Sequence, residues 1–479
     1  MDEKELEKLF SNGILVDESV RNYDVPDIDS LVSKLREKNV SMLDSRALHD
    51  IYSGEVSENS ETYVEVLREY TGGTSASKPA DWVAYFGDRF DRLKNILLNK
   101  ESGGMMSISN IKNMPSGSDV KTIAMVSKVS ISPIKKFMVL DIEDLTGSYR
   151  ALSSAINPDL FEDQVVVIKG KKSKDAIFIN DISFPDIQIR DRREYDGPDA
   201  YALFLSDIHI GSKLFAGEAF ERFIAWLNGE YEEYSDISKL VKFILIVGDM
   251  VDGIGIYPDQ EKELEISDVR EQYNELYKFL DKIPKHIKII ISPGNHDATH
   301  IAEPQPRLDP LFSSSMYKLN NATLLSNPYQ VNLVVNGSKT NVLAYHGFSI
   351  PYYADTIPKY NKMEASDIAE IMKIHLRSRH LAPVHGSSQV IPLSRDFLVI
   401  EETPEVYVTG HIHKAMVSKY KETILVNSSC WQYQTSYQKK YGMSPEVAKV
   451  PFVNLKDKTF GMLDFLGEKP QIYKKGIKT

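Results

Sequence analysis

The chain contains very little cysteine: Cys430 is the single one in 479 residues. One thiol excludes an intramolecular disulfide framework and fits a reducing compartment. Long apolar runs are also missing, because no stretch approaches the roughly 18 uninterrupted apolar residues that a membrane-spanning helix needs. The N-terminal stretch MDEKELEKLF is charged and amphipathic and lacks the apolar core of a secretory signal. We therefore expect a cytoplasmic protein without a membrane partner.

Positive charge is in deficit, with 57 lysine and arginine residues against 68 aspartate and glutamate residues and a formal net charge of −11. A protein that binds duplex DNA on its own is usually basic. If nucleic acid is the substrate, a partner or a local basic patch must supply much of the affinity for the phosphate backbone. Acidic residues gathered around a metal site would account for part of the excess.

The chain is too long for one ordinary hydrophobic core, so two or three domains are expected. Residues 1–70 contain short stretches with helical periodicity, the last of them beginning at Thr62, and predict a helical module for packing or docking. Residues 71–100 begin with a linker rich in Thr, Gly and Ser and continue as an amphipathic helix.

The pattern changes to short strands in residues 101–190. Five strands at this spacing predict a small Greek-key barrel of the OB type. Such a barrel binds single-stranded nucleic acid in some proteins and is a structural or partner-docking unit in others, and the sequence leaves both open. A charged connector at residues 190–198 leads to an α/β domain at residues 199–479.

Metal-binding side chains follow directly on apolar strands in the α/β domain. A buried parallel strand reads as an apolar run, and its last side chains face the ligand crevice of the sheet. Five such runs each end in a small residue or turn and then in a side chain that can bind a metal. The runs are residues 202–205, 243–247, 287–292, 341–345 and 406–409. The side chains that follow them are Asp207, His209, Asp249, Asn295, His346, His411 and His413.

Three oxygen donors and four imidazoles are too many ligands for one ion and suit two. Two ions about 3.5–4 Å apart can hold both the attacking and the leaving oxygen of a phosphoryl displacement. A carboxylate that bridges the ions would offset their repulsion, and Asp249, in the tight turn after Gly248, is the candidate. The mixed nitrogen and oxygen set favours Mn, Fe or Zn over Mg or Ca alone. We expect two divalent ions, with Mn²⁺ preferred and Fe, Zn or Mg as alternatives.

A family resemblance rests on five motifs, SDIHIGS, VGDMVDG, PGNHDATH, YHG and GHIHK, which follow one another in this order. The motifs resemble those of the calcineurin-like metallophosphoesterases. The resemblance implies an α/β fold class: a two-sheet metallophosphoesterase domain at residues 199–479, preceded by the small OB-type β-barrel and the N-terminal helical module.

The resemblance also implies roles for the site residues. One ion would be held by Asp207, His209, Asp249 and His413, and the other by Asp249, Asn295, His346 and His411. His296, next to Asn295, matches the family residue that stabilises the transition state or protonates the leaving oxygen. Asp252 or Asp297 would orient its imidazole.

The order of the parts narrows the family. A helical segment, an OB-type barrel and a phosphoesterase domain together resemble the small subunits of archaeal D-family DNA polymerases. The corresponding accessory chains of eukaryotic replicative polymerases share the barrel and the phosphoesterase domain, but their metal ligands are degraded, whereas this chain keeps all seven. The segment AEPQP at residues 302–306 and the tail WQYQTSYQK at residues 431–439 also resemble the archaeal proteins.

This second resemblance implies a metal-dependent 3′→5′ exonuclease that removes mispaired nucleotides from single-stranded primer ends. Water would attack the terminal phosphodiester, and the 3′ oxygen of the penultimate nucleotide would leave. The resemblance also implies a heterodimer with the large catalytic subunit of a DNA-directed DNA polymerase. That partner would supply the DNA-binding surface that an acidic chain lacks.

Two other functions stay open. The chain is either a catalytically silent structural adaptor of the polymerase with a vestigial metal site, or a generic metallophosphatase that acts on protein or small-molecule phosphates. The intact ligand set speaks against the adaptor. The barrel and the tail speak against the phosphatase.

Overall fold

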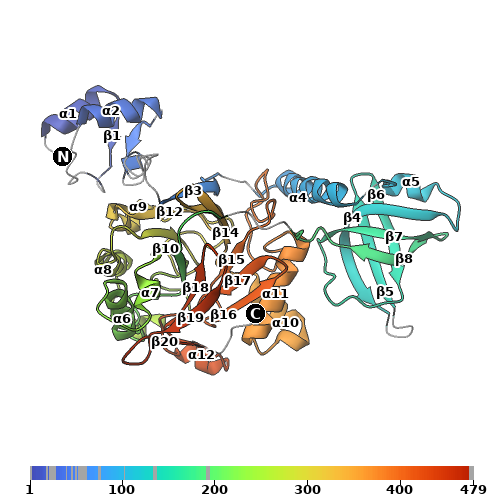
Figure 1. Ribbon diagram of the computed structural model, residues 1–479. Helices are drawn as coiled ribbons and strands as arrows, with labels where there is room; N and C mark the ends of the chain where they lie inside the picture. The colour runs from blue at the N-terminus through green and yellow to red at the C-terminus, as the bar shows by residue number, and fades with distance from the viewer. Residues whose placement is uncertain are drawn as a thin grey trace.

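The computed structural model describes residues 3–17, 20, 28–38, 40–44, 47, 48, 51, 62–73, 77–101, 103–132, 137–189 and 195–473. Parts of the predicted helical module and linker, and residues 190–194 of the predicted connector, lie outside these residues. Figure 1 shows a small N-terminal module, a large two-sheet body and a barrel beside it. None of the helices in these ranges combines the length and the apolar character that crossing a bilayer requires.

Two β-sheets lie face to face in the large body and enclose a shared core. The strands of the first sheet, in spatial order, are β12 (Ala322–Leu324), β11 (Lys288–Ser292), β10 (Val241–Val247), β9 (Tyr201–Leu205), β18 (Lys449–Asn454), β19 (Phe460–Asp464) and β20 (Gln471–Ile472). Those of the second are β16 (Met416–Tyr420), β17 (Thr423–Asn427), β15 (Val406–Thr409), β14 (Ser338–Ala344), β13 (Tyr329–Val335) and β3 (Thr62–Arg68). The predicted two-sheet α/β fold class is confirmed.

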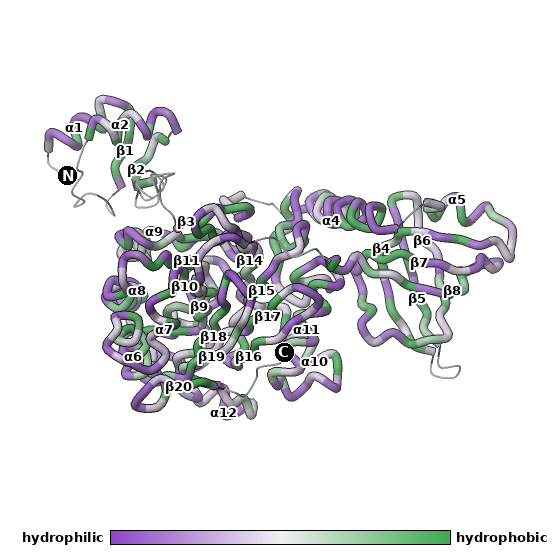
Figure 2. The backbone as a smooth tube through the Cα atoms, viewed as in Figure 1, coloured by the Kyte–Doolittle hydropathy of each residue, from purple (hydrophilic) through white to green (hydrophobic). Residues whose placement is uncertain are grey.

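Strand β10 shows why its sequence is apolar without interruption. Phe243 and Leu245 point into the core between the sheets, while Ile244 and Ile246 belong to the core on the helix side. A strand that is buried on both faces reads as a continuous apolar run. Figure 2 shows hydrophobic residues concentrated along the central strands of this body.

Helices cover the outer face of each sheet. Residues of α6 and α8 share the core of the first sheet, and residues of α11 share a core with β14–β17 of the second. The helices of this body are α6 (Gly217–Leu227), α7 (Ser235–Ser238), η3 (Gln260–Lys262), α8 (Val269–Leu280), α9 (Pro310–Ser313), η4 (Met316–Lys318), α10 (Ile350–Thr356), η5 (Pro358–Tyr360), α11 (Ala365–Ser378) and α12 (Ser436–Lys440).

The direction of the strands positions the site. β9, β10 and β11 are parallel neighbours in the first sheet, and β14 and β15 are parallel neighbours in the second. Because the carboxyl ends of parallel strands lie at one edge of a sheet, the turns that follow these five strands lie near one another.

The predicted OB-type barrel is present as a closed five-stranded barrel. In spatial order its strands are β4 (Asp119–Ile131), β5 (Met138–Asp144), β6 (Gly147–Ser153), β8 (Ala176–Ser183) and β7 (Val165–Lys172), and β7 pairs with β4 to close it. The barrel has an apolar core of its own, to which the short helix α5 (Ile108–Lys112) contributes.

The N-terminal module mixes helices with a short parallel sheet around a core of its own. Its elements are α1 (Glu3–Ser11), β1 (Leu15–Val16), α2 (Ile28–Glu37) and β2 (Met42–Leu43). The prediction of a helix from Thr62 is wrong, because this stretch forms strand β3, which pairs antiparallel with β13. Its sequence, TYVEVLR, is rich in residues that favour strands, and the distant edge of β13 supplies a pairing that local periodicity cannot reveal.

Helix α4 (Pro79–Lys100) connects the barrel with the two-sheet body. Its apolar face packs against strands β4 and β7 of the barrel. Arg89 reaches the other way: its Nε donates to Asp396 Oδ2 at 2.7 Å and its Nη1 donates to the carbonyl oxygen of Pro383 at 2.9 Å. The side chains of Arg89 and Asp396 are 2% and 0% exposed, so the connection depends on a fully buried charge pair.

Replacing Arg89 with alanine is expected to destabilise the protein by about 3–5 kcal/mol, because the Asp396 carboxylate is then buried without its cation. Urea unfolding followed by circular dichroism measures the loss. Arg150→Ala is the matched control, since Arg150 and its partner Asp141 are 60% and 41% exposed and such a pair contributes at most about 1 kcal/mol. Equal unfolding midpoints for the two variants would show that the buried pair has no special weight.

Candidate metal centre

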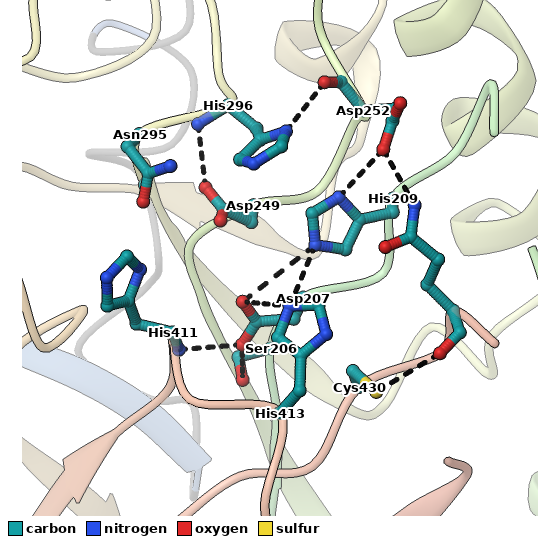
Figure 3. A network of polar contacts seen from close by, with 12 residues as sticks. Ser206, Asp207, His209, Asp249, Asp252, Asn295, His296, His411, His413 and Cys430 are labelled. Atoms are coloured by element: carbon teal, nitrogen blue, oxygen red, sulfur yellow. Dashed lines mark hydrogen bonds and ion pairs between the residues drawn. The ribbon is translucent and has the colours of Figure 1, made fainter. Parts of the chain in front are cut away.

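The seven side chains that the sequence proposed as ligands lie at the carboxyl ends of five strands. Asp207 and His209 follow β9, Asp249 follows β10, and the other four follow β11, β14 and β15. Figure 3 shows most of them, from both sheets, pointing toward one another in a single network. The structure therefore brings the complete predicted set together.

One group of ligand atoms is formed by Asp207, His209 and His413. His413 Nε2 lies 3.3 Å from Asp207 Oδ1 and 3.1 Å from His209 Nε2. His209 Nε2 lies 4.0 Å from the same carboxylate oxygen. Three ligand atoms thus face one point, in an arrangement that can hold one ion.

A second group of ligand atoms is formed by Asp249, His346 and His411. His346 Nε2 lies 3.3 Å from Asp249 Oδ2 and 3.2 Å from Asn295 Oδ1. The two groups adjoin, because the backbone N–H of His411 donates to Asp207 Oδ2 at 2.9 Å. Two neighbouring groups of this kind match the expectation of a site for two ions.

Hydrogen bonds on the far side of two rings set which nitrogen faces the site. His346 Nδ1 donates to the carbonyl oxygen of Val247 at 2.8 Å, and His209 Nδ1 donates to Asp252 Oδ1 at 3.0 Å. Each bond leaves the lone pair of Nε2 directed at the carboxylates. Imidazoles that bind metals are usually oriented by such a partner on the other ring nitrogen.

The unpaired oxygen of Asp207 tests whether a cation fits here. Asp207 is fully buried, and no hydrogen bond reaches its Oδ1 from the described residues. A buried carboxylate oxygen without a donor is costly, and a cation between Asp207, His209 and His413 would remove that cost. The combination of carboxylate, amide and imidazole donors suits a divalent transition metal, so the residues fit the implied ions.

The backbone is strained where the proposed ligands stand. Positive φ angles occur at Asp207 (52°), His209 (56°), Asp249 (52°), His411 (71°) and His413 (56°). Each non-glycine residue in this region costs of order 1–3 kcal/mol, and such strain persists at functional sites because the surrounding structure enforces it. The strain is further support for a functional role of these turns.

Two glycines allow the turns to approach one another closely. A Cβ on Gly248, whose φ is +86°, would lie 2.2 Å from His346 Nδ1. A Cβ on Gly294 would lie 2.3 Å from Asp249 Oδ1. The glycines of the VGD and PGN motifs are therefore needed for space at the site.

The electrostatics keep the acidic ligands ionised. Burial alone would raise the pKa of Asp207 and of Asp249, but neighbouring histidines hold both pKa values below the ordinary value of an aspartate. Burial would lower the pKa of His346, yet Asp249 beside it raises that pKa to about 9. Burial and the charge of His346 lower the pKa of His411 to about 3. Charged carboxylates beside imidazoles are ready to accept a cation in place of a proton.

His296 lies at the open side of the centre. Its backbone N–H donates to Asp249 Oδ1 at 2.8 Å, and its ring packs edge-on against His209 with the centroids 4.6 Å apart. Its Nδ1 donates to the backbone carbonyl oxygen of Asp252 at 2.7 Å. His296 and the neighbouring Asn295 are partly exposed, which leaves His296 Nε2 available to a substrate.

Asp252 and Asp297 were expected to orient the ring of His296 through a carboxylate. The orienting atom is instead the backbone carbonyl of Asp252, while its carboxylate binds His209. Asp297 Oδ2 accepts from the N–H of Gly294 at 2.8 Å, and its Oδ1 accepts from the hydroxyl of Tyr273 at 3.0 Å. Burial and the charge of Asp249 raise the pKa of Asp297 to about 7. Asp297 thus shapes the PGNHD turn.

Three glutamines beside the centre were not predicted from the sequence. Gln260 and Gln432 donate to the two carboxylate oxygens of Asp252 at 2.9 and 2.8 Å. The Gln438 amide lies 2.9 Å from His413 Nδ1. Their roles depend on contacts between distant segments, and no spacing in the sequence signals them.

The AEPQP segment adds a buried acid next to the site. Glu303 is 0% exposed and accepts a hydrogen bond from the hydroxyl of Tyr345 at 3.2 Å. Burial raises the pKa of Glu303 to about 8. The folded protein therefore keeps this carboxyl protonated at neutral pH, whereas the unfolded chain ionises it.

Glu303→Gln is expected to become more stable relative to the unchanged protein as pH rises. Between pH 4.5 and about 8 the unfolded chain releases a proton that the folded chain retains, so stability is lost across this window by up to about 1.4 kcal/mol per pH unit. The glutamine variant lacks that loss. Urea unfolding at pH 5 and pH 8 measures the change, and the exposed Glu422→Gln is the control. A difference that is the same at both pH values would contradict a protonated Glu303.

The two sheets, the ligands at the strand ends and their grouping define the class as a calcineurin-like metallophosphoesterase fold. The family model for the B-type subunits of DNA polymerases alpha and epsilon matches residues 202–418. The chain is 38% identical to the DNA polymerase II small subunit of Methanothermobacter thermautotrophicus over 399 residues, which cover 81% of this chain and 79% of that one. It therefore belongs to the family of archaeal DNA polymerase II small subunits.

Two further comparisons extend along most or part of the chain. The DNA polymerase II small subunit of Thermoplasma acidophilum is 34% identical over 473 residues, which cover 96% of this chain and 89% of that one. Among solved structures, Vacuolar Protein Sorting 29 from Cryptosporidium parvum covers 57% of this chain and 96% of its own, with 14% identity and a TM-score of 0.28.

Proposed function

We propose that this chain is a metal-dependent 3′→5′ exonuclease that trims single-stranded DNA ends for proofreading, as the small subunit of a DNA polymerase heterodimer with a large catalytic subunit. The observation that carries the nuclease is the convergence of seven ligand side chains from five strand ends. The partnership is supported by the similarity to proteins named as small subunits.

The proposed ion positions follow the two groups of ligand atoms. One position would be formed by Asp207, His209, Asp249 and His413, and the other by Asp249, Asn295, His346 and His411. Asp249 lies between the groups: its Oδ2 faces His346, and its Oδ1 accepts the backbone N–H of His296. We expect Mn²⁺, with Fe, Zn or Mg as alternatives, since the donors mix nitrogen and oxygen.

Two divalent ions at such a centre would activate the attacking water and neutralise charge on the phosphoryl oxygens. The chain itself would bind and orient the substrate and move the proton. A protonated His296 has one N–H engaged by the carbonyl of Asp252, so Nε2–H is free to donate to a phosphoryl oxygen or to the leaving 3′ oxygen. Asn295, His296 and His411 are partly exposed and mark the side from which the strand would enter.

The division of the chain into a helical module (1–70), a linker and helix (71–100), an OB-type barrel (101–190) and a phosphoesterase domain (199–479) is part of the proposal. Strand β3 modifies it, because residues 62–68 belong to the second sheet. The barrel is offered to the partner subunit or to single-stranded DNA.

The test is a digestion of 5′-labelled single-stranded DNA by the full chain with Mn²⁺, alone and with the large subunit. A ladder of strands shortened from the 3′ end, abolished by a chelator, is the expected result. No ladder in either form would favour a structural adaptor of the polymerase. Rapid turnover of a phosphomonoester without digestion of DNA would favour a metallophosphatase.

A further inference from the structure

A chain of aromatic rings leads from the candidate centre to the surface. The ring of Tyr257 lies 6.4 Å from that of His296, and the ring of Tyr437 lies 5.9 Å from that of Tyr257. The ring of Tyr441 lies a further 4.7 Å from Tyr437. Each step is within the range of direct ring contact, so the three tyrosines continue the open side of the centre outward.

The outer part of this chain of rings is exposed to solvent. Tyr257 is partly buried, whereas Tyr437 is 43% and Tyr441 is 58% exposed. The ammonium group of Lys440 lies 5.7 Å from the Tyr441 ring centroid, and Lys439 beside it is exposed. Exposed aromatic faces with neighbouring lysines are the composition of a surface that binds single-stranded nucleic acid.

Contacts with the centre hold these rings in place. Glu263 accepts from the hydroxyl of Tyr257 at 3.0 Å and from the backbone N–H of Ser436 at 3.3 Å, which joins the loop of Tyr257 to the start of α12. Gln438, on the same helix as Tyr437, contacts the proposed ligand His413. The position of the tyrosines relative to the centre is therefore set by the same helix that supports a ligand.

We propose that Tyr257, Tyr437 and Tyr441 form a stacking track for the bases of single-stranded DNA whose 3′ end enters the centre; this inference rests on the proposed nuclease. The net charge of −11 makes phosphate attraction weak outside local patches. Stacking on aromatic rings supplies affinity that is independent of net charge. It is also tolerant of sequence, since every base has an aromatic face, as an enzyme that trims any mispaired end requires.

The test compares binding of the full chain to a fluorescent oligothymidine and to an abasic strand of the same length, in a chelator so that no cleavage occurs. The double variant Tyr437→Ala/Tyr441→Ala should bind oligothymidine at least about tenfold more weakly and lose its preference over the abasic strand. Tyr437→Phe/Tyr441→Phe keeps the rings and should bind normally. Tyr433→Ala, which removes another exposed tyrosine of the same tail (46% exposed), is the matched control.

Several results would overturn the track. They are an unchanged affinity of the alanine variant, an equal loss in the phenylalanine variant, or failure of the unchanged protein to prefer bases over the abasic strand. Loss of the large subunit from the alanine variant without loss of DNA affinity would identify a protein-docking surface instead. Failure of the nuclease is separate, because a chain that shows the expected affinities but makes no ladder would support the track and contradict the nuclease.

Discussion

The Asp249→Ala variant is expected to lose both divalent ions and to digest single-stranded DNA at least about 10³-fold more slowly, since removal of even one electrostatic contact to a transition state costs about 10²–10³. Asp249 is 2% exposed and is the one carboxylate placed between the two groups of ligand atoms. Without it, neither proposed position keeps a complete set of donors.

Metal content after gel filtration, measured by mass spectrometry, reports this loss directly. Asp259→Ala is the matched control, because the Asp259 side chain is 71% exposed and pairs with Lys262 away from the site. That control should keep its ions and its activity. Retention of two ions by Asp249→Ala would remove Asp249 as the bridging ligand.

His296→Ala should have the opposite pattern, with metal content preserved and cleavage slowed by about 10²–10⁴-fold, the usual contribution of a general acid. The His296 ring is held by the Asp252 carbonyl and by contact with the His209 ring, and it belongs to neither proposed ion position. Its removal therefore takes away a proton donor without removing a ligand.

The measurements for His296→Ala are metal content and the rate of ladder formation on the same preparation. His300→Ala is the control, since His300 is exposed and its Nδ1 donates only locally, to the carbonyl oxygen of Ala302. Loss of metal from His296→Ala would show that the residue is a ligand or a structural support. An unchanged rate would exclude it from the chemistry.

The sequence was sufficient for the main fold and the position of the site because both depend on local patterns. Apolar runs such as residues 243–247 predict strands buried on both faces, and the metal-capable residue after each run predicts where the strand ends meet. The same logic placed Asp249 and His346 together, although 97 positions separate them in the chain. Parallel strand direction converts sequence position into spatial proximity.

Features that depend on distant partners were not predictable. Strand β3 was read as a helix because its pairing partner, β13, lies far along the chain. The carbonyl of Asp252 that orients His296, and the Gln438 amide beside His413, are set by loop conformations and not by spacing. The positive φ angles at Asp207 and His209 likewise need the packed turns around them, since neither residue type favours that conformation by itself.

The most direct test of the account is a crystal structure of the full chain with Mn²⁺, with the ions located by anomalous scattering. The account predicts two peaks about 3.5–4 Å apart, one beside Asp207, His209 and His413, the other beside Asn295, His346 and His411, with Asp249 between them. A single peak, or peaks away from these side chains, would contradict the two-ion centre on which the proposed nuclease depends.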